Sequence, residues 1–189
     1  EAFRSLRTNL QFASVATPIH SVVVTSPSPS EGKSVIAANL ASVIAQGGHK
    51  VVVLDSDLRR PRVHQVLGLK NRLGLTDLFL RPQSDVKSVM QPTEVKNLSV
   101  VTTGSLPPNP SELLGSQRMI EIIQNLESQF DLVILDAPPA LVVTDANVLA
   151  NRTDGVLLVV RPNVSKRADI NHAMEQLTQV KANIVGVVI

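Results

Sequence analysis

The chain has 189 residues, of which 43% are hydrophobic and 18% charged, a composition typical of one globular domain with a buried core. The absence of cysteine excludes a disulfide scaffold, a thiolate zinc site and a cysteine nucleophile, and the absence of Tyr and Trp excludes an aromatic stacking surface for single-stranded nucleic acid. A net charge of +2 provides no strong general field for nucleic acid, and no apolar run has the roughly 18–20 residues that span a bilayer.

The elements predicted along the chain alternate between short apolar runs and longer helical patterns. Residues 1–17 interleave polar and apolar side chains in the pattern of an amphipathic helix. Six apolar runs rich in β-branched residues are then predicted to be strands: 22–24, 51–54, 98–101, 132–135, 156–160 and 184–189. Because these runs are apolar throughout, they indicate parallel strands that are covered on both faces.

Three further helices are predicted between the strands. One spans residues 34–46 and ends at two glycines. Ser111 is expected to cap a second helix that includes Leu126, and Ser165 is expected to cap a third that extends to about Val180.

The alternation of strands and helices predicts an α/β fold, namely an open, doubly wound, mostly parallel sheet with helices on both faces. Residues 58–97 have no clear strand pattern and are broken by glycines and prolines, so we expect them to form a surface insertion. In such sheets ligands bind beyond the carboxyl ends of the strands. The residues just after each strand are therefore the candidates for a functional site.

A phosphate-binding loop is predicted between the first strand and the following helix. The segment from Thr25 to Ser34 is TSPSPSEGKS; Gly32, Lys33 and Ser34 fit the end of the pattern G-x-x-x-x-G-K-[ST], whereas Pro27 occupies the position of its first glycine. Backbone N–H groups and the positive helix end would face the phosphates, Lys33 would neutralise them, and the Ser34 hydroxyl would ligate Mg²⁺. The alternative, an ordinary polar turn before a helix, is disfavoured by this strand–loop–helix context.

Three aspartates are predicted at the same edge of the sheet. Asp55 and Asp57 follow the run 51–54, and Asp136 follows the run 132–135. Asp136 fits the Walker B aspartate that holds Mg²⁺, whereas Asp55 and Asp57 either position a nucleophile's hydroxyl, contribute to the Mg²⁺ site or divide these tasks. A single aspartate after a strand is more often a turn or a helix cap, but three beside a Gly-Lys-Ser loop indicate a Mg²⁺–nucleoside triphosphate site.

Other polar residues carry weaker signals. In the basic turn over 59–62, an arginine either stabilises a transferring phosphate, holds an acidic partner or is simply solvated. The proline-rich segment 107–114 locally predicts a rigid turn that leads into a helix. The histidines show no metal-ligand spacing and are predicted to be structural or surface residues: His20, His49, His64 and His172.

Four segments taken together resemble one known family. They are residues 1–10 (EAFRSLRTNL), similar to an E-x-x-R-x-x-R oligomerisation helix; residues 31–34 (EGKS) in a deviant Walker A loop; residues 53–61 (VLDSDLRRP), similar to a Walker A′ motif; and residues 107–114 (PPNPSELL) with the Walker B segment 136–139 (DAPP). On these motifs the chain resembles, over essentially its whole length, the cytoplasmic catalytic domain of bacterial tyrosine kinases. These are capsular or exopolysaccharide regulators related to the MinD/ParA branch of P-loop ATPases.

The resemblance implies an ATP-dependent protein-tyrosine kinase that regulates polysaccharide polymerisation and export, with a MinD-like P-loop NTPase fold. It assigns ATP binding to Ser30, Glu31, Gly32, Lys33, Ser34 and Val35; Mg²⁺ binding to Ser34, Asp55 and Asp136; and catalysis to Lys33, Asp55, Asp57 and Asp136. It assigns oligomerisation to Glu1, Arg4 and Arg7, which would join subunits into a ring that presents tyrosines to neighbouring active sites. Without the resemblance, these three residues are by default a solvated face.

The resemblance also implies domains, partners and location. Residues 1–17 would be the oligomerisation helix and residues 18–189 the P-loop domain, which we expect to be truncated because the chain ends within an apolar run. The expected partners are further copies of the chain, protein tyrosine substrates and a polysaccharide co-polymerase membrane protein or fused membrane domain, with no nucleic acid. The segment itself is expected to be soluble and to act at the cytoplasmic face of the bacterial inner membrane.

Two departures from the family pattern affect the prediction. Ser30 replaces a glycine of the usual Pro-Gly-Glu-Gly-Lys loop, so a positive φ at this position would strain the loop and weaken nucleotide binding. The chain contains no tyrosine and therefore has no residue of its own to phosphorylate on tyrosine.

The alternative function is a MinD/ParA-type ATPase switch, which hydrolyses ATP and binds partners according to nucleotide state. Such proteins generally carry a lysine at the position of Ser28, so Ser28 favours the kinase, as do residues 59–61 and the proline-rich segment. A regulatory module with weakened catalysis is a third hypothesis, which Ser30 supports.

Overall fold

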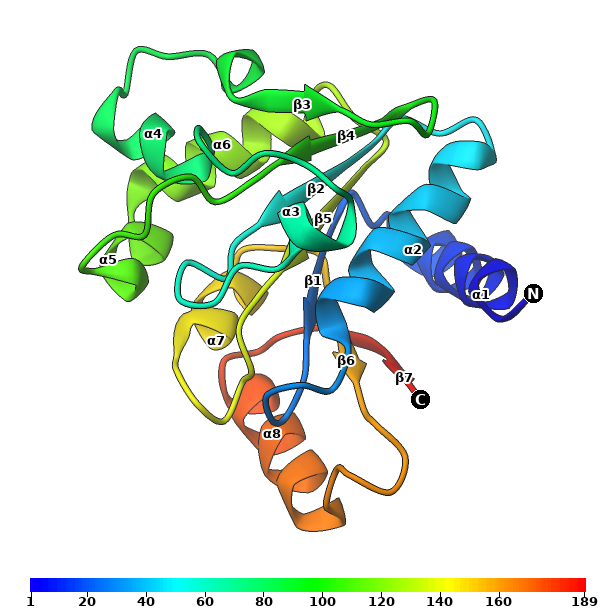
Figure 1. Cartoon of the computed structure of the whole chain (residues 1–189). Helices are drawn as coiled ribbons and strands as arrows, with labels where there is room; N and C mark the ends of the chain where they lie inside the picture. Colours follow the sequence, from blue (N-terminus) through cyan, green and yellow to red (C-terminus); the bar gives the residue numbers. More distant parts are fainter.

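A seven-stranded sheet forms the centre of the computed structural model, which describes residues 1–189 apart from the side chain of Ala16 (Figure 1). Its strands are β1 (Ser21–Thr25), β2 (Val51–Asp55), β3 (Met90–Pro92), β4 (Leu98–Val101), β5 (Leu132–Asp136), β6 (Gly155–Val159) and β7 (Ile184–Val188). Their order in space is β3-β4-β2-β5-β1-β6-β7, and all neighbours are parallel except β3 and β4. The six predicted strands and the mostly parallel sheet are confirmed.

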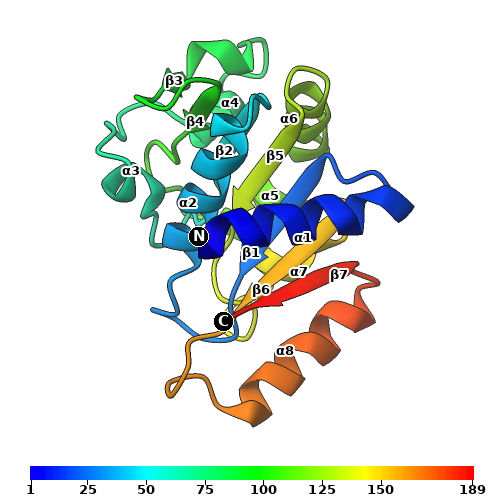
Figure 2. The same ribbon diagram turned by 90° about the vertical axis from the view of Figure 1, so that its right-hand side faces the viewer.

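Helices cover both faces of the sheet, as predicted. On one face lie α1 (Ala2–Ala16), α2 (Lys33–Gln46) and α3 (Val63–Val66), and Figure 2 views the molecule from the side of α1. On the other face lie α4 (Leu75–Leu80), the 3₁₀ helix η1 (Val86–Ser88), α5 (Pro110–Gly115), α6 (Gln117–Glu127), α7 (Asp145–Ala150) and α8 (Arg167–Gln179).

The two hydrophobic cores explain why the strands are apolar throughout. In β1, Val22 and Val24 pack into the core beneath α1 and α2, whereas Val23 packs into the core on the opposite face. All three side chains are 0% exposed. Since successive side chains of a strand point to opposite faces, a strand covered on both sides needs apolar residues at every position.

The structure corrects two predictions in the second half of the chain. The helix expected from Ser111 is two helices, because the backbone at Ser116 is extended and its hydroxyl caps α6 by accepting a hydrogen bond from the Met119 N–H at 3.3 Å. The last long helix begins at Arg167, and Ser165 bonds to the phosphate loop instead of capping it.

The segment 58–97 is more than a surface insertion. It contains the edge strand β3, which is short, antiparallel and half-buried, so no apolar run reveals it in the sequence. It also contributes Leu75, Leu78 and Val86 to the core beside α6, where their side chains are at most 3% exposed. The expectation that it lies wholly on the surface is therefore wrong.

Strands β2, β5 and β1 are neighbours in the middle of the sheet, and their carboxyl ends open at one edge. The phosphate loop leaves β1 at this edge, so the topology brings the predicted site residues together. Among the helices that the structure describes, none has both the length and the apolar character needed to cross a bilayer.

Candidate functional site: a nucleotide pocket at the strand ends

The phosphate loop is braced by bonds within the protein. Glu31 is 5% exposed; its Oε2 accepts a hydrogen bond from the Ser28 N–H at 2.9 Å, and its Oε1 accepts one from the Ser165 hydroxyl. The Arg161 guanidinium donates to the Ser30 carbonyl at 3.2 Å. The Glu31 side chain therefore joins the loop to the segment between β6 and α8, which leaves its backbone to face a ligand.

The loop backbone is shaped for an anion. Gly32, directly before α2, has φ 92° and ψ 8°, and Ser30 has φ 63°, so the strain expected for serine at position 30 is present. Lys33, Ser34 and Val35 form the first turn of α2, where backbone N–H groups lack helical partners and the helix dipole is positive. Phosphate groups bind readily at such helix ends.

Two fully buried carboxylates stand side by side next to the loop. Asp55 and Asp136 occupy partner positions at the ends of β2 and β5, and both are 0% exposed. The Asp136 Oδ2 accepts from the Ser34 hydroxyl at 2.5 Å, and the Asp55 Oδ2 accepts from the Val63 N–H at 3.1 Å. The Oδ1 atom of each carboxylate is buried without a hydrogen-bond partner among the described residues.

These carboxylates fit a divalent cation. Burial, together with the neighbouring Asp136, raises the pKa of Asp55 well above its usual range. Burial also raises the pKa of Asp136 to about 6, although Lys33 and the Ser34 hydroxyl partly oppose this shift. Two unpartnered acceptor atoms that favour a positive charge, beside the Ser34 hydroxyl, are a donor set suited to Mg²⁺.

These protein donors alone would not complete the coordination of Mg²⁺, so a substrate would have to supply further oxygen ligands. Within the described part of the chain, no three His, Cys, Asp or Glu side chains lie close enough together to form a complete metal site. Mg²⁺ is commonly held by one or two carboxylates and by substrate phosphates, so an incomplete protein cage is the arrangement expected at a nucleotide site.

The third aspartate has a different environment. The Asp57 Oδ2 forms an ion pair with the Lys33 ammonium at 3.1 Å, and its Oδ1 accepts from the backbone N–H groups of Arg59 and Arg60 at 3.3 and 2.9 Å. Asp57 therefore shapes the turn after β2 and also holds the P-loop lysine at the pocket. Asp57 is 2% exposed and lines the pocket, whereas Asp55 and Asp136 lie behind the lining.

An ion pair that the sequence did not indicate fixes the same turn. The Arg59 Nε and Nη2 donate to the two carboxylate oxygens of Asp145 at 2.9 and 3.2 Å, and Asp145 is 0% exposed. The Ser111 hydroxyl donates to the Asp145 Oδ1 at 2.5 Å. Asp145 is a lone aspartate far along the chain, so no local spacing links it to Arg59. The network gives the proline-rich segment a structural role, because it ties α5 to the turn that carries Asp57.

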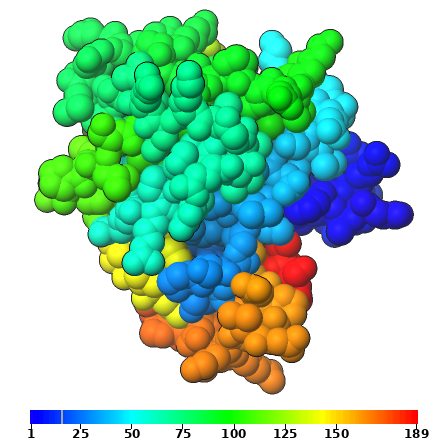
Figure 3. All heavy atoms as spheres, in the orientation of Figure 1, coloured from blue at the N-terminus to red at the C-terminus, as the bar shows by residue number. Residues whose placement is uncertain are grey.

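These elements enclose a pocket of about 610 Å³, the size of typical small-molecule sites. The loop and α2, the segment that follows β2 and the segment that follows β5 adjoin one another on the face shown in Figure 3. The lining residues are Pro29, Ser30, Gly32, Lys33, Ser34, Val35, Asp57, Arg59, Arg60, Arg62, Gln65, Val66, Pro138, Pro139, Val142 and Val143. Most of the predicted nucleotide-binding residues therefore share one cavity.

The three predicted oligomerisation residues lie on α1, away from this pocket. Glu1 and Arg4 are exposed and line a hollow on the polar face of the helix. Arg7 is half-buried, and its Nη1 donates to the Val43 carbonyl near the end of α2 at 3.4 Å. Arg7 thus has a bond within its own chain, whereas Glu1 and Arg4 remain available at the surface.

Comparisons with known proteins agree with this geometry. The family model described as "ParA: NUBPL iron-transfer P-loop NTPase" matches residues 18–189. The tyrosine-protein kinase YwqD of Bacillus subtilis (strain 168) is 43% identical over 188 residues, which cover 100% of this chain and 79% of that protein. The chain belongs to the bacterial tyrosine-protein kinase family of P-loop NTPases. The family assignment made from the four motifs is confirmed.

Solved structures of this kinase family have the same fold. The kinase domain of Escherichia coli tyrosine kinase ETK superimposes with a TM-score of 0.93 at 36% identity, covering 99% of this chain and 73% of that one. The chimerical protein CapA2B2 gives a TM-score of 0.93 at 37% identity, covering 98% and 81%. The cell division ATPase MinD of Pyrococcus furiosus, at 23% identity and a TM-score of 0.74, shares the fold.

Relatives differ in how much of their length the chain spans. The chain covers 26% of the tyrosine-protein kinase etk of Escherichia coli (strain K12) at 36% identity, and 25% of the putative tyrosine-protein kinase EpsB of Ralstonia solanacearum at 43% identity. In these proteins the kinase-like region is one part of a longer polypeptide.

Proposed function

We propose that this domain transfers the γ-phosphoryl group of Mg²⁺–ATP to tyrosine hydroxyls of proteins. The observation that carries the proposal is the pair of buried, unpartnered carboxylate oxygens of Asp55 and Asp136 beside the P-loop Lys33 and Ser34. Two carboxylates without neutralising partners are costly to bury, and a nucleotide-bound cation removes that cost. Family membership favours tyrosine as the acceptor.

In this proposal each part of the site has one task. The loop backbone and the first turn of α2 bind the phosphates, and Ser34, Asp55 and Asp136 hold Mg²⁺, which would neutralise charge on the phosphate oxygens. Lys33, now paired with Asp57 at 3.1 Å, turns to the phosphates when the nucleotide binds. That exchange releases the Asp57 Oδ2 to face the pocket.

Asp57 then orients the incoming hydroxyl. The tyrosine oxygen forms a bond to the γ-phosphorus, the bond from that phosphorus to the bridging oxygen breaks, ADP leaves, and the tyrosine proton passes to the Asp57 carboxylate. Such a reaction depends mostly on positioning and on charge neutralisation. The bonds from Asp57 to the turn and the Arg59–Asp145 ion pair supply the positioning.

The test is incubation of the chain with Mg²⁺, γ-labelled ATP and a tyrosine-rich peptide, with phosphotyrosine and free phosphate measured separately. Since the chain has no tyrosine, any phosphotyrosine arises on the peptide. Wild-type protein is expected to label the peptide, Lys33→Met to lose at least 100-fold of that rate, and the surface change Lys50→Met to retain it. Phosphate release without peptide labelling would instead support the ATPase switch.

The assembly and location of the domain are part of the same proposal. The exposed Glu1 and Arg4 on α1 support contact with a second copy of the chain, and a ring would place a neighbouring copy beside each pocket. We propose further that the domain acts in capsule or exopolysaccharide production, which its similarity to the kinases named EpsB and CapB supports. The cytoplasmic face of the membrane and a fused or separate co-polymerase complete this proposal.

A further inference from the structure

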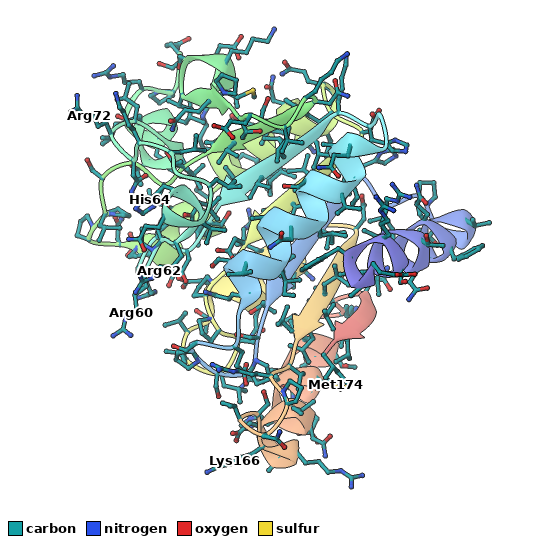
Figure 4. All side chains as sticks on the ribbon, turned by 45° about the vertical axis from the view of Figure 1, so that its right-hand side comes forward. Arg60, Arg62, His64, Arg72, Lys166 and Met174 are labelled. Atoms are coloured by element: carbon teal, nitrogen blue, oxygen red, sulfur yellow. The ribbon has the colours of Figure 1, made fainter. Side chains whose placement is uncertain are left out.

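Two arginines at the rim of the pocket have side-chain charges that neither an ion pair nor the proposed chemistry uses. Arg60 and Arg62 line the pocket, and their side chains extend away from the body of the molecule (Figure 4). Among the described residues neither forms an ion pair; Arg62 donates to the Gln65 amide oxygen at 2.7 Å. The neighbouring Arg59, by contrast, forms an ion pair with Asp145.

The rim carries an excess of positive charge after internal pairing. Before a nucleotide binds, Lys33 is matched by Asp57 and Arg59 by Asp145, whereas Arg60 and Arg62 have no carboxylate partner at the pocket mouth. After Lys33 has turned to the phosphates, Asp57 balances one of these two charges and a net positive charge remains. The phosphate loop and Lys33 form a different wall of the pocket and already supply the anion site for a nucleotide. The free charge of the rim is therefore available to a second anionic group.

Apolar side chains lie beside these arginines. Val66 on α3 is 39% exposed and Val142 after β5 is 57% exposed, and both line the same pocket. Exposed valines in the lining of a polar pocket offer a surface for an aromatic ring. The combination of apolar contacts and two guanidinium groups that form no ion pair fits a tyrosine with acidic neighbours.

The backbone holds the arginines at a defined place relative to the reacting group. The Arg60 N–H donates to the Asp57 Oδ1 at 2.9 Å, and Pro61 restricts the turn between the two arginines. Residues in an extended peptide are about 3.3–3.6 Å apart. Arg60 and Arg62 belong to the same short turn as Asp57, so the residues of a bound extended segment that contact them lie close in sequence to its tyrosine.

We propose that Arg60 and Arg62, with Val66 and Val142, form the docking surface for a tyrosine-containing protein segment that carries carboxylates close in sequence to the tyrosine. The inference rests on the proposed kinase function and specifies the substrate class of that site. The cations match the carboxylates, and the valines contact the ring.

The test measures binding without chemistry, so that it does not depend on phosphoryl transfer. Three peptides of equal length, with Phe in place of Tyr and with Glu, Gln or Lys as neighbours, are titrated into the Mg²⁺–ADP-loaded chain and followed by fluorescence anisotropy. Each exposed ion pair contributes a factor of about 2–5, so the Glu peptide is expected to bind about tenfold more tightly than the Gln peptide at low salt. The difference should shrink at high salt.

Variants assign the preference to the two arginines. The double variant Arg60→Ala/Arg62→Ala should abolish the preference and leave the affinity for ADP unchanged, and Arg60→Glu/Arg62→Glu should favour the Lys peptide. Arg72→Ala is the matched control, since Arg72 is exposed outside the pocket and its loss should change neither quantity.

Two results would overturn the docking surface: equal affinity of the wild-type chain for all three peptides, or a preference that survives loss of both arginines. Weaker ADP binding in the double variant would place the arginines in the nucleotide site instead. A clear Glu preference without any phosphotyrosine in the labelling assay would contradict the kinase proposal and leave the docking surface standing.

Discussion

At the scale of single residues, Ser30 shows how this loop departs from the usual glycine. Its φ of 63° lies in the left-handed region, which costs a residue with a Cβ roughly 1–2 kcal/mol. The loop holds this conformation because Glu31 is tied to Ser28 and Ser165 and because Arg161 binds the Ser30 carbonyl. The strain is thus balanced by bonds to the segment between β6 and α8.

Ser30→Gly should therefore stabilise the domain. Relief of the left-handed strain outweighs the greater freedom of glycine in the unfolded chain, for a net gain of about 0.5–1 kcal/mol in the free energy of unfolding. Urea denaturation measures this change. Ser28→Gly is the matched control: Ser28 has no positive φ, so the same substitution should destabilise the protein by a similar amount. A less stable Ser30→Gly variant would show that the loop is not strained.

At the scale of elements, α1 is attached to the domain and also exposed on one face. Leu10 is 8% exposed in the core beneath α2. Arg7 donates to the Val43 carbonyl near the C-terminal end of α2, where the helix dipole favours a cation. Arg4 points to the surface. Two arginines of one motif therefore have separable roles.

Arg7→Ala and Arg4→Ala should affect two different properties, stability and assembly. Arg7→Ala should lower the free energy of unfolding by about 0.5–1 kcal/mol, because it removes a bond and helix-dipole contact from the end of α2. Arg4→Ala should change stability by less than about 0.5 kcal/mol but reduce the assembly state in sedimentation experiments. If Arg4→Ala leaves the assembly unchanged, the contact between copies does not use this face of α1.

At the scale of the whole molecule, the sequence predicts the parts of the fold that are local and repeated. Strands buried on both faces are continuous apolar runs, and a P-loop lies between a strand and a helix, so both are visible in the sequence. The division between α5 and α6 depends on one capping serine, and β3 is held by pairing with β4. The Asp145–Arg59 pair joins residues 86 positions apart, so its partners become neighbours only in the folded chain.

The site was predictable for a related reason. Asp55 and Asp136 end strands, and Asp57 and the loop with Lys33 and Ser34 follow strands. A parallel sheet brings such ends to one edge. Their different environments were not predictable, since burial of Asp55 and Asp136 and the pairing of Asp57 with Lys33 depend on how the surrounding loops pack. The sequence therefore indicates which residues meet, and the structure shows how their charges are balanced.

The balance of charges makes stability depend on pH in an unusual direction. The pKa of Asp136 is about 6 in the folded chain against the usual 3.8, and that of Asp55 is also raised, so the folded state binds more protons than the unfolded state between about pH 4 and 6. Stability contributed by these groups is therefore lost as the pH rises through that window. For Asp136 the loss is about 3 kcal/mol, at about 1.4 kcal/mol per pKa unit.

Asp136→Asn should remove the part of the pH dependence of stability that comes from Asp136, and it should also weaken the proposed Mg²⁺ site. Without metal or nucleotide, the variant should be more stable than the wild type at pH 7.5 by about 1–3 kcal/mol, or roughly 2–4 °C in Tm for each kcal/mol, and the two should converge near pH 4–5. Mg²⁺ with ADP should raise the Tm of the wild type and leave that of the variant nearly unchanged. Glu175→Gln, at an exposed position, should follow the wild type throughout. If the metal-free stability of the wild type instead rises between pH 5.5 and 7.5, in parallel with that of the variant, the buried charge of Asp136 does not destabilise the fold. A bound cation would then have no such charge to relieve.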